Sequence, residues 1–389
     1  MNINRNDKSS NPRAELSRRA EIRLGFRCNA RCGFCYYQDL LDTPKDKEPT
    51  TQQLDKMLSA LRGMKAVEVE FTGGEPTIRS DLFHLAQRAR SLGFENVSLI
   101  TNGLRCANPV YAKQLVESGV NDVLFSLHGH TATIHDAHTA IHGSFDKILL
   151  AIENVRALGA RVRISTTVTG CNYTFTKEIV EQALRLKAEC IHLAVFSPAS
   201  QARGSQKQFF VTYTQASEAI KEAINIYQNQ LPPLSVKYIP FCFMQGYEQY
   251  VMNFYQQSYD PDDWNYYMSN KVRRAPGGMR AFAFDVTVLA GMLLAKDWTI
   301  PRRQGPLGMK VHGFTWIVEL LIKRRLPACR QCRYDVVCDH VWKDYLNVFG
   351  GDEIAPVPGT KLKDPAWSYV MSNYRKPGER VGLCSRCVL

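Results

Sequence analysis

Residues 21–37 read EIRLGFRCNARCGFCYY, a short strand pattern followed at once by three closely spaced cysteines. Cys28, Cys32 and Cys35 have the spacing C-x3-C-x2-C. Three thiolates on one short loop can hold three irons of a [4Fe–4S] cube and leave the fourth iron open to a small ligand. The alternatives are a structural zinc site, which normally has four protein ligands, and three buried thiols without a metal.

A second motif, FTGGEPT at residues 71–77, follows the next strand pattern. Gly73 and Gly74 allow the backbone to approach a ligand closely, and the Glu75 carboxylate can accept hydrogen bonds from an ammonium group. A tight turn with a solvated glutamate would also explain this motif alone. The two motifs, however, follow adjacent strands of the chain.

Between residues 21 and 204, β-branched runs alternate with amphipathic segments of helical period. The predicted strands are residues 21–25, 67–71, 97–101, 123–127, 162–168 and 191–196, and the predicted helices are residues 52–61, 81–92, 110–118, 145–158 and 177–187. Helical crossovers bring successive strands in parallel. We therefore predict an α/β fold, a partial (β/α)6 TIM-like barrel, with both motifs at the carboxyl ends of its strands, where barrel active sites assemble.

The combination of motifs resembles the radical S-adenosylmethionine (radical SAM) superfamily over residues 21–204. The resemblance implies that Cys28, Cys32 and Cys35 are catalytic and hold a [4Fe–4S] cluster with an open iron. It also implies that S-adenosylmethionine (SAM) is the second cofactor. The further cofactor-binding positions that it implies are Phe34 near the adenine, Gly73, Gly74 and Glu75 at the methionyl amine, and Thr101, Asn102, Ser126 and His128.

The same resemblance implies a reaction. The reduced cluster donates one electron to SAM, and the 5′-deoxyadenosyl radical so formed abstracts hydrogen from a substrate, while the protein orients the reactants and excludes water. An external electron donor such as flavodoxin or ferredoxin is then required.

Histidines crowd into residues 126–145, SLHGHTATIHDAHTAIHGSF. Their spacing does not match a strong metal site, so we interpret them as a pocket-lining segment. This segment resembles the corresponding region of radical SAM enzymes with auxiliary clusters. Many of those enzymes have an arginine three residues after the aspartate that corresponds to Asp136. This chain has Thr139 there.

A second cysteine group, Cys329, Cys332 and Cys338, has the spacing C-x2-C-x5-C, and Cys384 and Cys387 form CSRC at the end of the sequence. The interval between the pairs is too long for a zinc ribbon. The pattern resembles the SPASM/twitch auxiliary-cluster extension, but Trp342 stands where that pattern has a further cysteine. The resemblance thus implies one auxiliary [4Fe–4S] cluster.

That cluster would be held by Cys329, Cys332 and Cys338, with Cys384 or Cys387 as fourth ligand. Cys242 is the second choice, since a cysteine between two phenylalanines is typical of a core. Cys106, Cys171 and Cys190 have no partner at ligand spacing and are interpreted as structural.

The chain has 389 residues, of which 45% are hydrophobic, and this composition excludes a disordered protein. We divide it into a basic tail (1–20), the barrel (21–205), a connector (206–325) and an auxiliary-cluster domain (326–389). The excess positive charge is concentrated in residues 271–330, which hold twelve Lys or Arg and three Asp or Glu. This region is a solvated face or attracts an anionic partner.

We see no secretion signal and no transmembrane segment, and therefore expect a cytoplasmic protein with reduced cysteines. By family analogy, the predicted function is radical modification of a ribosomally synthesised peptide or protein side chain. Dehydrogenation or rearrangement of a small, anionic metabolite is the alternative. A non-catalytic iron–sulfur or zinc protein that binds nucleic acid is a third hypothesis; it is disfavoured by the GGEP loop and by the lack of a nucleic-acid-binding module, so we expect no stable nucleic-acid complex.

Overall fold

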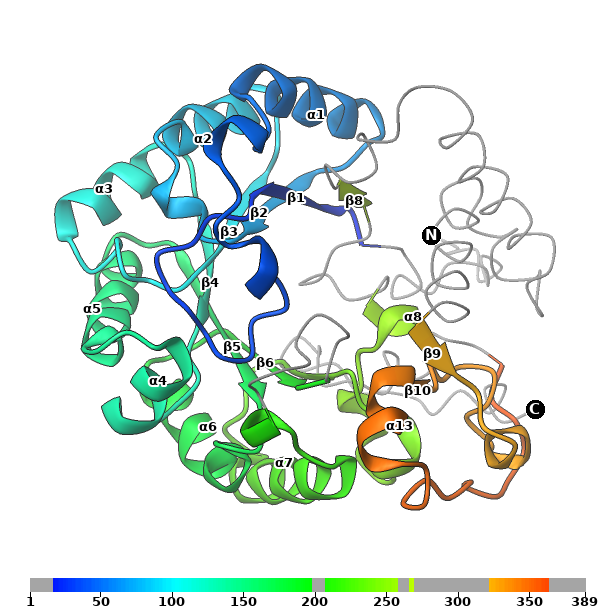
Figure 1. Ribbon diagram of the computed structural model, residues 1–389. Helices are drawn as coiled ribbons and strands as arrows, with labels where there is room; N and C mark the ends of the chain where they lie inside the picture. The colour runs from blue at the N-terminus through cyan, green and yellow to red at the C-terminus, as the bar shows by residue number, and fades with distance from the viewer. Residues whose placement is uncertain (1–16, 198–206, 258–265, 269–321, 364–389) are drawn as a thin grey trace, which may run out of the picture.

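The computed structural model describes residues 17–197, 207–257, 266–268 and 322–363 (Figure 1). Its main feature is an eight-stranded, entirely parallel sheet with the order β7-β6-β5-β4-β3-β2-β1-β8. The strands are β1 (Arg19–Gly25), β2 (Glu68–Gly73), β3 (Asn96–Thr101), β4 (Asp122–Ser126), β5 (Arg161–Val168), β6 (Cys190–Val195), β7 (Leu234–Lys237) and β8 (Tyr266–Met268).

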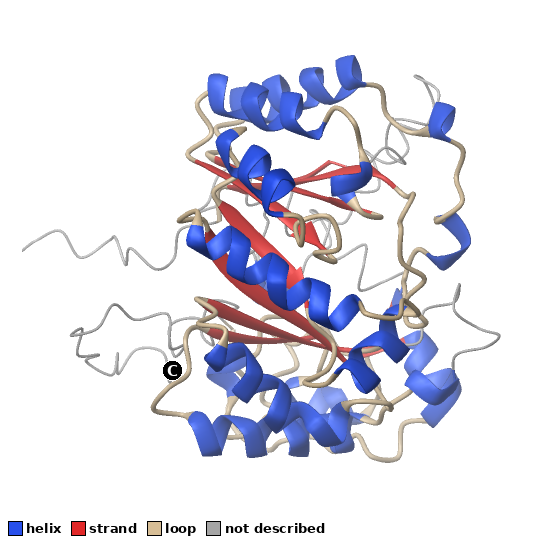
Figure 2. Cartoon of the chain, turned by 90° about the vertical axis from the view of Figure 1, so that its left-hand side faces the viewer, coloured by secondary structure: helices blue, strands red, loops and turns tan. Residues whose placement is uncertain are grey.

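Helices cover the outer face of the curved sheet, and Figure 2 shows them from that side. They are α1 (Thr51–Gly63), α2 (Leu82–Ser91), α3 (Pro109–Glu117), α4 (Ala132–Thr139), α5 (Ser144–Ala157), α6 (Thr176–Arg185) and α7 (Tyr213–Tyr227). The short helix α8 (Phe254–Gln257) lies instead beside the C-terminal described segment. Short 3-10 helices are η2 (Gln38–Leu40), η3 (Lys45–Lys47), η4 (Pro76–Ile78), η5 (Tyr173–Phe175), η6 (Lys207–Phe209), η7 (Phe241–Phe243), η8 (Glu248–Tyr250) and η9 (Ala328–Gln331).

Helix α1 illustrates how the sequence forms this outer layer. Thr50 and Gln53 make a reciprocal capping box that satisfies free amides at the start of the helix. Leu54, Leu58 and Leu61 then recur at helical spacing and are buried. The apolar face therefore packs on the sheet, and burial of each such side chain contributes about 2 kcal/mol.

A buried network of charges closes the amino ends of the strands. Arg163 bonds to Asp122 and Glu70, each at 2.7 Å, and Arg19 contacts the same two carboxylates at 3.1 and 3.3 Å. Both guanidinium groups are almost completely buried. Because buried charges are tolerated only when they are paired, the network fixes this end of the sheet opposite the cysteine loop.

The C-terminal described segment packs beside the end of the sheet that carries β7 (Figure 1). It contains the antiparallel pair β9 (Lys323–Arg324) and β10 (Val341–Trp342), followed by α13 (Lys343–Phe349). Tyr345 of α13 stacks on Tyr213 of α7 with ring centroids 3.8 Å apart, and Tyr334 stacks on Phe241 at 5.4 Å. These aromatic contacts join the segment to the sheet and its helices.

The predicted α/β partial barrel is confirmed, and all six predicted strands and the five predicted helices are present. The sheet also includes β7 and β8, which come from the predicted connector, and α4 lies within the histidine-rich segment. Most of the basic region at 271–330 lies outside the described residues. In the part of the chain that is described, no helix combines the length and apolar character that a bilayer crossing requires.

Candidate functional site

The first cysteine group lies on the loop that follows β1. The backbone N–H of Ala30 donates to Cys28 Sγ and that of Tyr37 donates to Cys35 Sγ, both at 3.4 Å. The N–H of Cys35 also bonds to the Cys32 carbonyl at 3.0 Å, which forms a turn between them. Such N–H···S bonds favour the thiolate form and are one of the features that tune an iron–sulfur cluster.

The thiols of this loop are difficult to ionise without a cation. Burial raises the pKa of Cys28 to about 11 and raises the pKa values of Cys32 and Cys35 as well, and the neighbouring thiols repel a second negative charge on Cys32. Among the described residues, no three His, Cys, Asp or Glu side chains converge on the place of a single metal ion.

The glycine loop after β2 is hydrogen-bonded to the cysteine loop. Gly74 N–H donates to Gly25 O at 3.0 Å, and Glu75 N–H donates to Arg27 O at 2.9 Å. A Cβ atom on Gly74 would lie 2.1 Å from Arg27 O, and one on Gly73, whose φ is +134°, would lie 2.2 Å from Gly25 O. Only glycine permits this approach of two backbones, so the two motifs form one structural unit.

The Glu75 side chain is buried and surrounded by donors from its own chain. Its Oε1 accepts from Thr77 N–H at 3.0 Å, Thr77 Oγ1 at 2.6 Å and Thr101 Oγ1 at 2.7 Å, while Oε2 accepts from Asn102 N–H at 2.8 Å. Burial raises the pKa of the carboxyl, and these hydrogen bonds oppose that shift. Glu75 thus orders the carboxyl ends of β2 and β3; its predicted contact with a methionyl amine stays a prediction.

The predicted polar positions on β3 and β4 surround the same edge of the sheet. Asn102 Nδ2 donates to Asn29 Oδ1 at 2.8 Å and lies 3.9 Å from Cys28 Sγ. Ser126 is the last residue of β4 and is half-buried. Asn102 therefore connects β3 to the cysteine loop, while Ser126 ends the neighbouring strand.

Phe34 lies within an aromatic cluster between the cysteine loop and α4. Its ring centroid is 4.7 Å from that of His128, 5.9 Å from His138 and 6.0 Å from Phe209. His135 stacks on His128 at 6.0 Å. Burial lowers the pKa of His128 well below its usual range and that of His135 to about 4, so both rings are neutral near pH 7. These neutral rings are packed against one another, and His128 is packed against Phe34; we call His128, His135 and His138 the histidine wall.

Each of the three histidines has at least one ring nitrogen in a hydrogen bond, while His135 Nε2 is buried without a hydrogen-bond partner. His128 Nδ1 accepts from Thr167 N–H at 3.2 Å, and His135 Nδ1 accepts from His128 N–H at 3.1 Å. His138 Nε2 lies 2.9 Å from Thr169 Oγ1. These contacts show three buried, packed histidines, and their role in lining a pocket stays a prediction.

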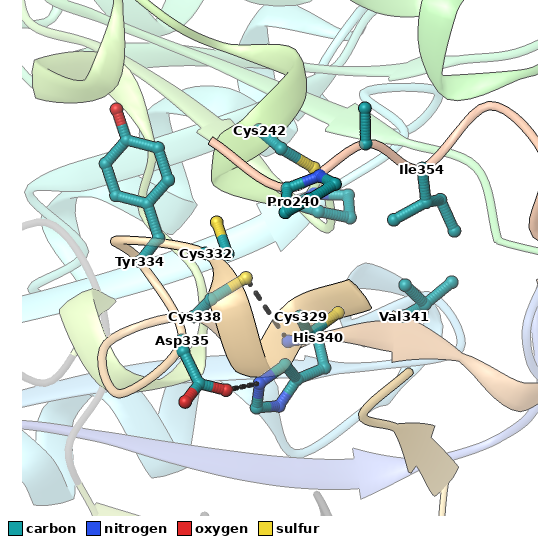
Figure 3. A pocket seen from close by; sticks show the side chains of 12 residues that line it. Pro240, Cys242, Cys329, Cys332, Tyr334, Asp335, Cys338, His340, Val341 and Ile354 are labelled. Carbon is teal, nitrogen blue, oxygen red and sulfur yellow. Dashed lines mark hydrogen bonds and ion pairs between the residues drawn. The ribbon is translucent and has the colours of Figure 1, made fainter. Parts of the chain in front are cut away.

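The second cysteine group surrounds a cavity at the junction of η7 and the C-terminal segment (Figure 3). Cys329, Cys332 and Cys338 line it together with Cys242, and its empty space is about 350 Å³, part of it open to solvent. Val357 N–H donates to Cys332 Sγ and His340 N–H donates to Cys338 Sγ, both at 3.4 Å. Cys384 and Cys387 lie outside the described residues.

Two features near the cysteine loop were not singled out from the sequence. Glu48 binds the guanidinium group of Arg27, which precedes Cys28, at 2.9 and 3.0 Å. Both residues line a hollow that reaches Gly74 and Glu75; its empty space is about 180 Å³, with open solvent included. No local motif distinguishes Glu48, because it meets Arg27 only through the fold.

Of the three cysteines interpreted as structural, Cys106 and Cys190 are buried, and Cys171 is exposed.

Comparison with known proteins matches the part of the chain that carries this site to a protein family. Residues 22–189 match the model of the radical SAM superfamily, and these residues include both motifs and strands β2 to β5 in full. This part of the chain is a radical SAM domain. Members of this superfamily use a [4Fe–4S] cluster and SAM. The three half-buried thiols and the N–H···S bonds to Cys28 and Cys35 fit the cluster.

Curated relatives match part of this chain. The AdoMet-dependent heme synthase of Oleidesulfovibrio alaskensis is 30% identical over 175 residues, which are 45% of this chain and 44% of that protein. The mycofactocin maturase MftC of Mycolicibacterium smegmatis is 35% identical over 166 residues, 42% of this chain and 41% of MftC. The GTP 3′,8-cyclase of Bradyrhizobium diazoefficiens is 30% identical over 175 residues, 41% of this chain and 50% of the cyclase. The chain thus spans about half the length of these relatives.

Two solved structures resemble this chain more distantly. Streptococcus suis SuiB has a TM-score of 0.48 and 16% identity, covering 57% of this chain and 49% of SuiB. The anSMEcpe structure with bound AdoMet and Cp18Cys peptide has a TM-score of 0.46 and 17% identity, covering 54% of this chain and 60% of that one.

Proposed function

We propose that this protein cleaves SAM reductively at the β1–β2 edge and uses the resulting radical to abstract hydrogen from a substrate. The observation that carries the proposal is the hydrogen-bonded unit formed by the cysteine loop and the glycine loop. Cys28, Cys32 and Cys35 would hold the cluster. When reduced, the cluster supplies one electron that splits SAM into methionine and a 5′-deoxyadenosyl radical.

The chain's own residues bind and orient the reactants. Gly73 and Gly74 let the glycine loop pack directly on the backbone of the cysteine loop, which places the two loops side by side near the thiols. Glu75 and Thr101 hold this loop in one geometry, while Asn102 fixes the cysteine loop against β3. Phe34, packed on His128, provides an apolar wall that excludes water from a reactive species. In this proposal Phe34 lies near the adenine and Ser126 contacts the ribose or carboxylate.

A second iron–sulfur centre at Cys329, Cys332 and Cys338 belongs to the same proposal. These thiols line a cavity beside the sheet, and backbone N–H groups bond to two of them. The centre would relay an electron or bind substrate. An external donor such as flavodoxin or ferredoxin would reduce the first cluster.

For the substrate, we propose a side chain of a ribosomally synthesised peptide or protein. The relative MftC, named a mycofactocin maturase, supports a maturation reaction. A small metabolite is the second candidate, and it is favoured by the names of the heme synthase and the GTP 3′,8-cyclase.

The test of SAM cleavage is anaerobic incubation of the reconstituted protein with SAM and a reductant. We expect release of 5′-deoxyadenosine by the wild type and its loss in Cys32→Ala, with Cys171→Ala as a control for an exposed cysteine. Equal release by Cys32→Ala would refute the proposed cluster site. No release by the wild type would favour a non-catalytic metal protein.

The substrate class is tested by isotope transfer. A deuterated peptide encoded next to this gene should pass deuterium into 5′-deoxyadenosine if the maturation proposal holds. Transfer from a deuterated anionic metabolite, without transfer from the peptide, would favour the second candidate.

A further inference from the structure

Cys242 lies far upstream of the second cysteine group in the sequence, yet the fold places it at the same cavity. It is the central residue of η7, directly after β7. Figure 3 shows its side chain above the central space and those of Cys329, Cys332 and Cys338 below. The four cysteines therefore line one and the same cavity.

The 3-10 helix η7 packs on the second cysteine group. Phe241 stacks on Tyr334, which lies between Cys332 and Cys338 in the sequence. This contact holds η7, and with it Cys242, against the loop that carries the other thiols.

The other polar side chains that line the cavity have partners elsewhere. Asp335 accepts hydrogen bonds from Arg325 at 2.6 Å and from Lys361 at 2.7 Å. His340 Nε2 faces Asp335 at 3.5 Å, and the Tyr334 hydroxyl donates to Glu248. Among the described lining residues, Cys242 is thus the remaining soft donor that matches the three thiols.

The lining suits an iron–sulfur cluster. Apart from the four cysteines it is largely apolar, from Pro240, Val341, Ile354 and Pro356. Four thiolates, one for each iron, are the common ligand set of a [4Fe–4S] cube.

We propose that Cys242 is the fourth ligand of the second iron–sulfur centre, in place of Cys384 or Cys387. This inference rests on the proposed function only in assuming that the second centre exists. The cluster would then join the connector after β7 to the C-terminal segment. Because ligation links two distant parts of the chain, cluster binding would contribute directly to the stability of their junction.

The experiment uses the full chain with Cys28→Ala, Cys32→Ala and Cys35→Ala combined, so that only the second centre can load. After anaerobic reconstitution we expect about four irons per chain and the electron paramagnetic resonance signal of a reduced [4Fe–4S] cluster. Adding Cys242→Ser should lower the iron content or change this signal. Adding Cys384→Ser together with Cys387→Ser should leave both unchanged.

The opposite pattern, with the cluster intact in Cys242→Ser and lost in the Cys384/Cys387 double variant, would overturn the proposal. Circular dichroism checks that each variant is folded. If Cys242→Ser does not fold, alkylation of the loaded triple variant decides instead: Cys384 and Cys387 should react while the cluster is bound. Their protection until a chelator is added would contradict the assignment of Cys242.

This experiment tests the assignment of Cys242 separately from SAM cleavage, because iron binding by the triple variant does not require SAM cleavage. Absence of any cluster from the triple variant would refute the second centre itself and, with it, the role of Cys242. Loss of SAM cleavage in the wild type with four irons still bound by the triple variant would leave the assignment of Cys242 standing and refute the reaction.

Discussion

The Thr101 hydroxyl at the end of β3 donates a 2.7 Å hydrogen bond to the buried carboxylate of Glu75 after β2. This bond joins the ends of two adjacent strands beneath the glycine loop. Because the carboxylate is also bonded to Thr77 and to the Asn102 backbone, Thr101 supplies one of four donors that compensate its burial.

Thr101→Val should therefore weaken the loop without removing a cluster ligand. A lost bond to a buried charged group lowers the free energy of unfolding by about 1.5–3 kcal/mol. We expect SAM to bind about tenfold more weakly, measured by equilibrium binding, with unchanged iron content. Thr51→Val removes a 2.6 Å bond to Asp81 at the start of α1 and serves as control. Equal SAM affinities in wild type and Thr101→Val would argue against this role.

Gly74→Ala tests the close approach of the two loops. The added Cβ would lie 2.1 Å from Arg27 O and 2.3 Å from Phe26 O, so one backbone has to move. We expect release of 5′-deoxyadenosine to fall at least about a hundredfold, because small displacements of a site have effects of that order. Gly63→Ala, at the end of α1 with no atom within 4 Å, should be neutral. An active Gly74→Ala protein would show that the approach is not required.

Local pattern was enough to predict the strands that carry the site. Val97, Leu99 and their counterparts on neighbouring strands form short apolar runs because these strands are buried on both faces. β7 and β8 were not predicted, since Leu234–Lys237 has only four residues and Tyr266–Met268 lies in an aromatic stretch without alternation. Pairing with a neighbouring strand, rather than local propensity, defines such short strands.

The site shows the same division between local and long-range information. Cys28, Cys32 and Cys35 can be recognised in the sequence because their close spacing is typical of cluster ligands. The neighbours of Cys242 cannot, because they are distant in the sequence and come together only in the folded chain. Likewise, the sequence indicated Glu75 as an amine-binding carboxylate but gave no sign of its bond to Thr101.

The buried charge network predicts that substitution of two arginines of β5 will lower the free energy of unfolding by very different amounts. Arg163 is fully buried between Glu70 and Asp122. Arg163→Met leaves both carboxylates with less compensation, and we expect a loss of about 3–5 kcal/mol in the free energy of unfolding. Arg161→Met removes a part-exposed contact of 3.8 Å to Asp122 and should lose at most about 1 kcal/mol. Denaturant titration measures both; equal losses would contradict the network's role.

The pH dependence of stability should report the buried histidine wall. Burial lowers the pKa of His135 to about 4 in the folded protein, against about 6.5 when unfolded. Between these values the unfolded chain binds more protons, so stability is complete above pH 6.5 and falls as the pH is lowered toward 4. From pH 7.5 to pH 5.5 the contribution of His135 alone should fall by about 1 kcal/mol.

His135→Asn isolates this contribution, because its amide oxygen can replace Nδ1 as acceptor for His128 N–H. Although His128 keeps part of the dependence, the loss of stability between pH 7.5 and 5.5 should be smaller in the variant than in the wild type. His142→Asn, at an exposed position, is the matched control and should keep the wild-type slope. Denaturant midpoints at several pH values measure the slopes. A steeper slope in His135→Asn than in His142→Asn would show that His135 is not held neutral by the fold.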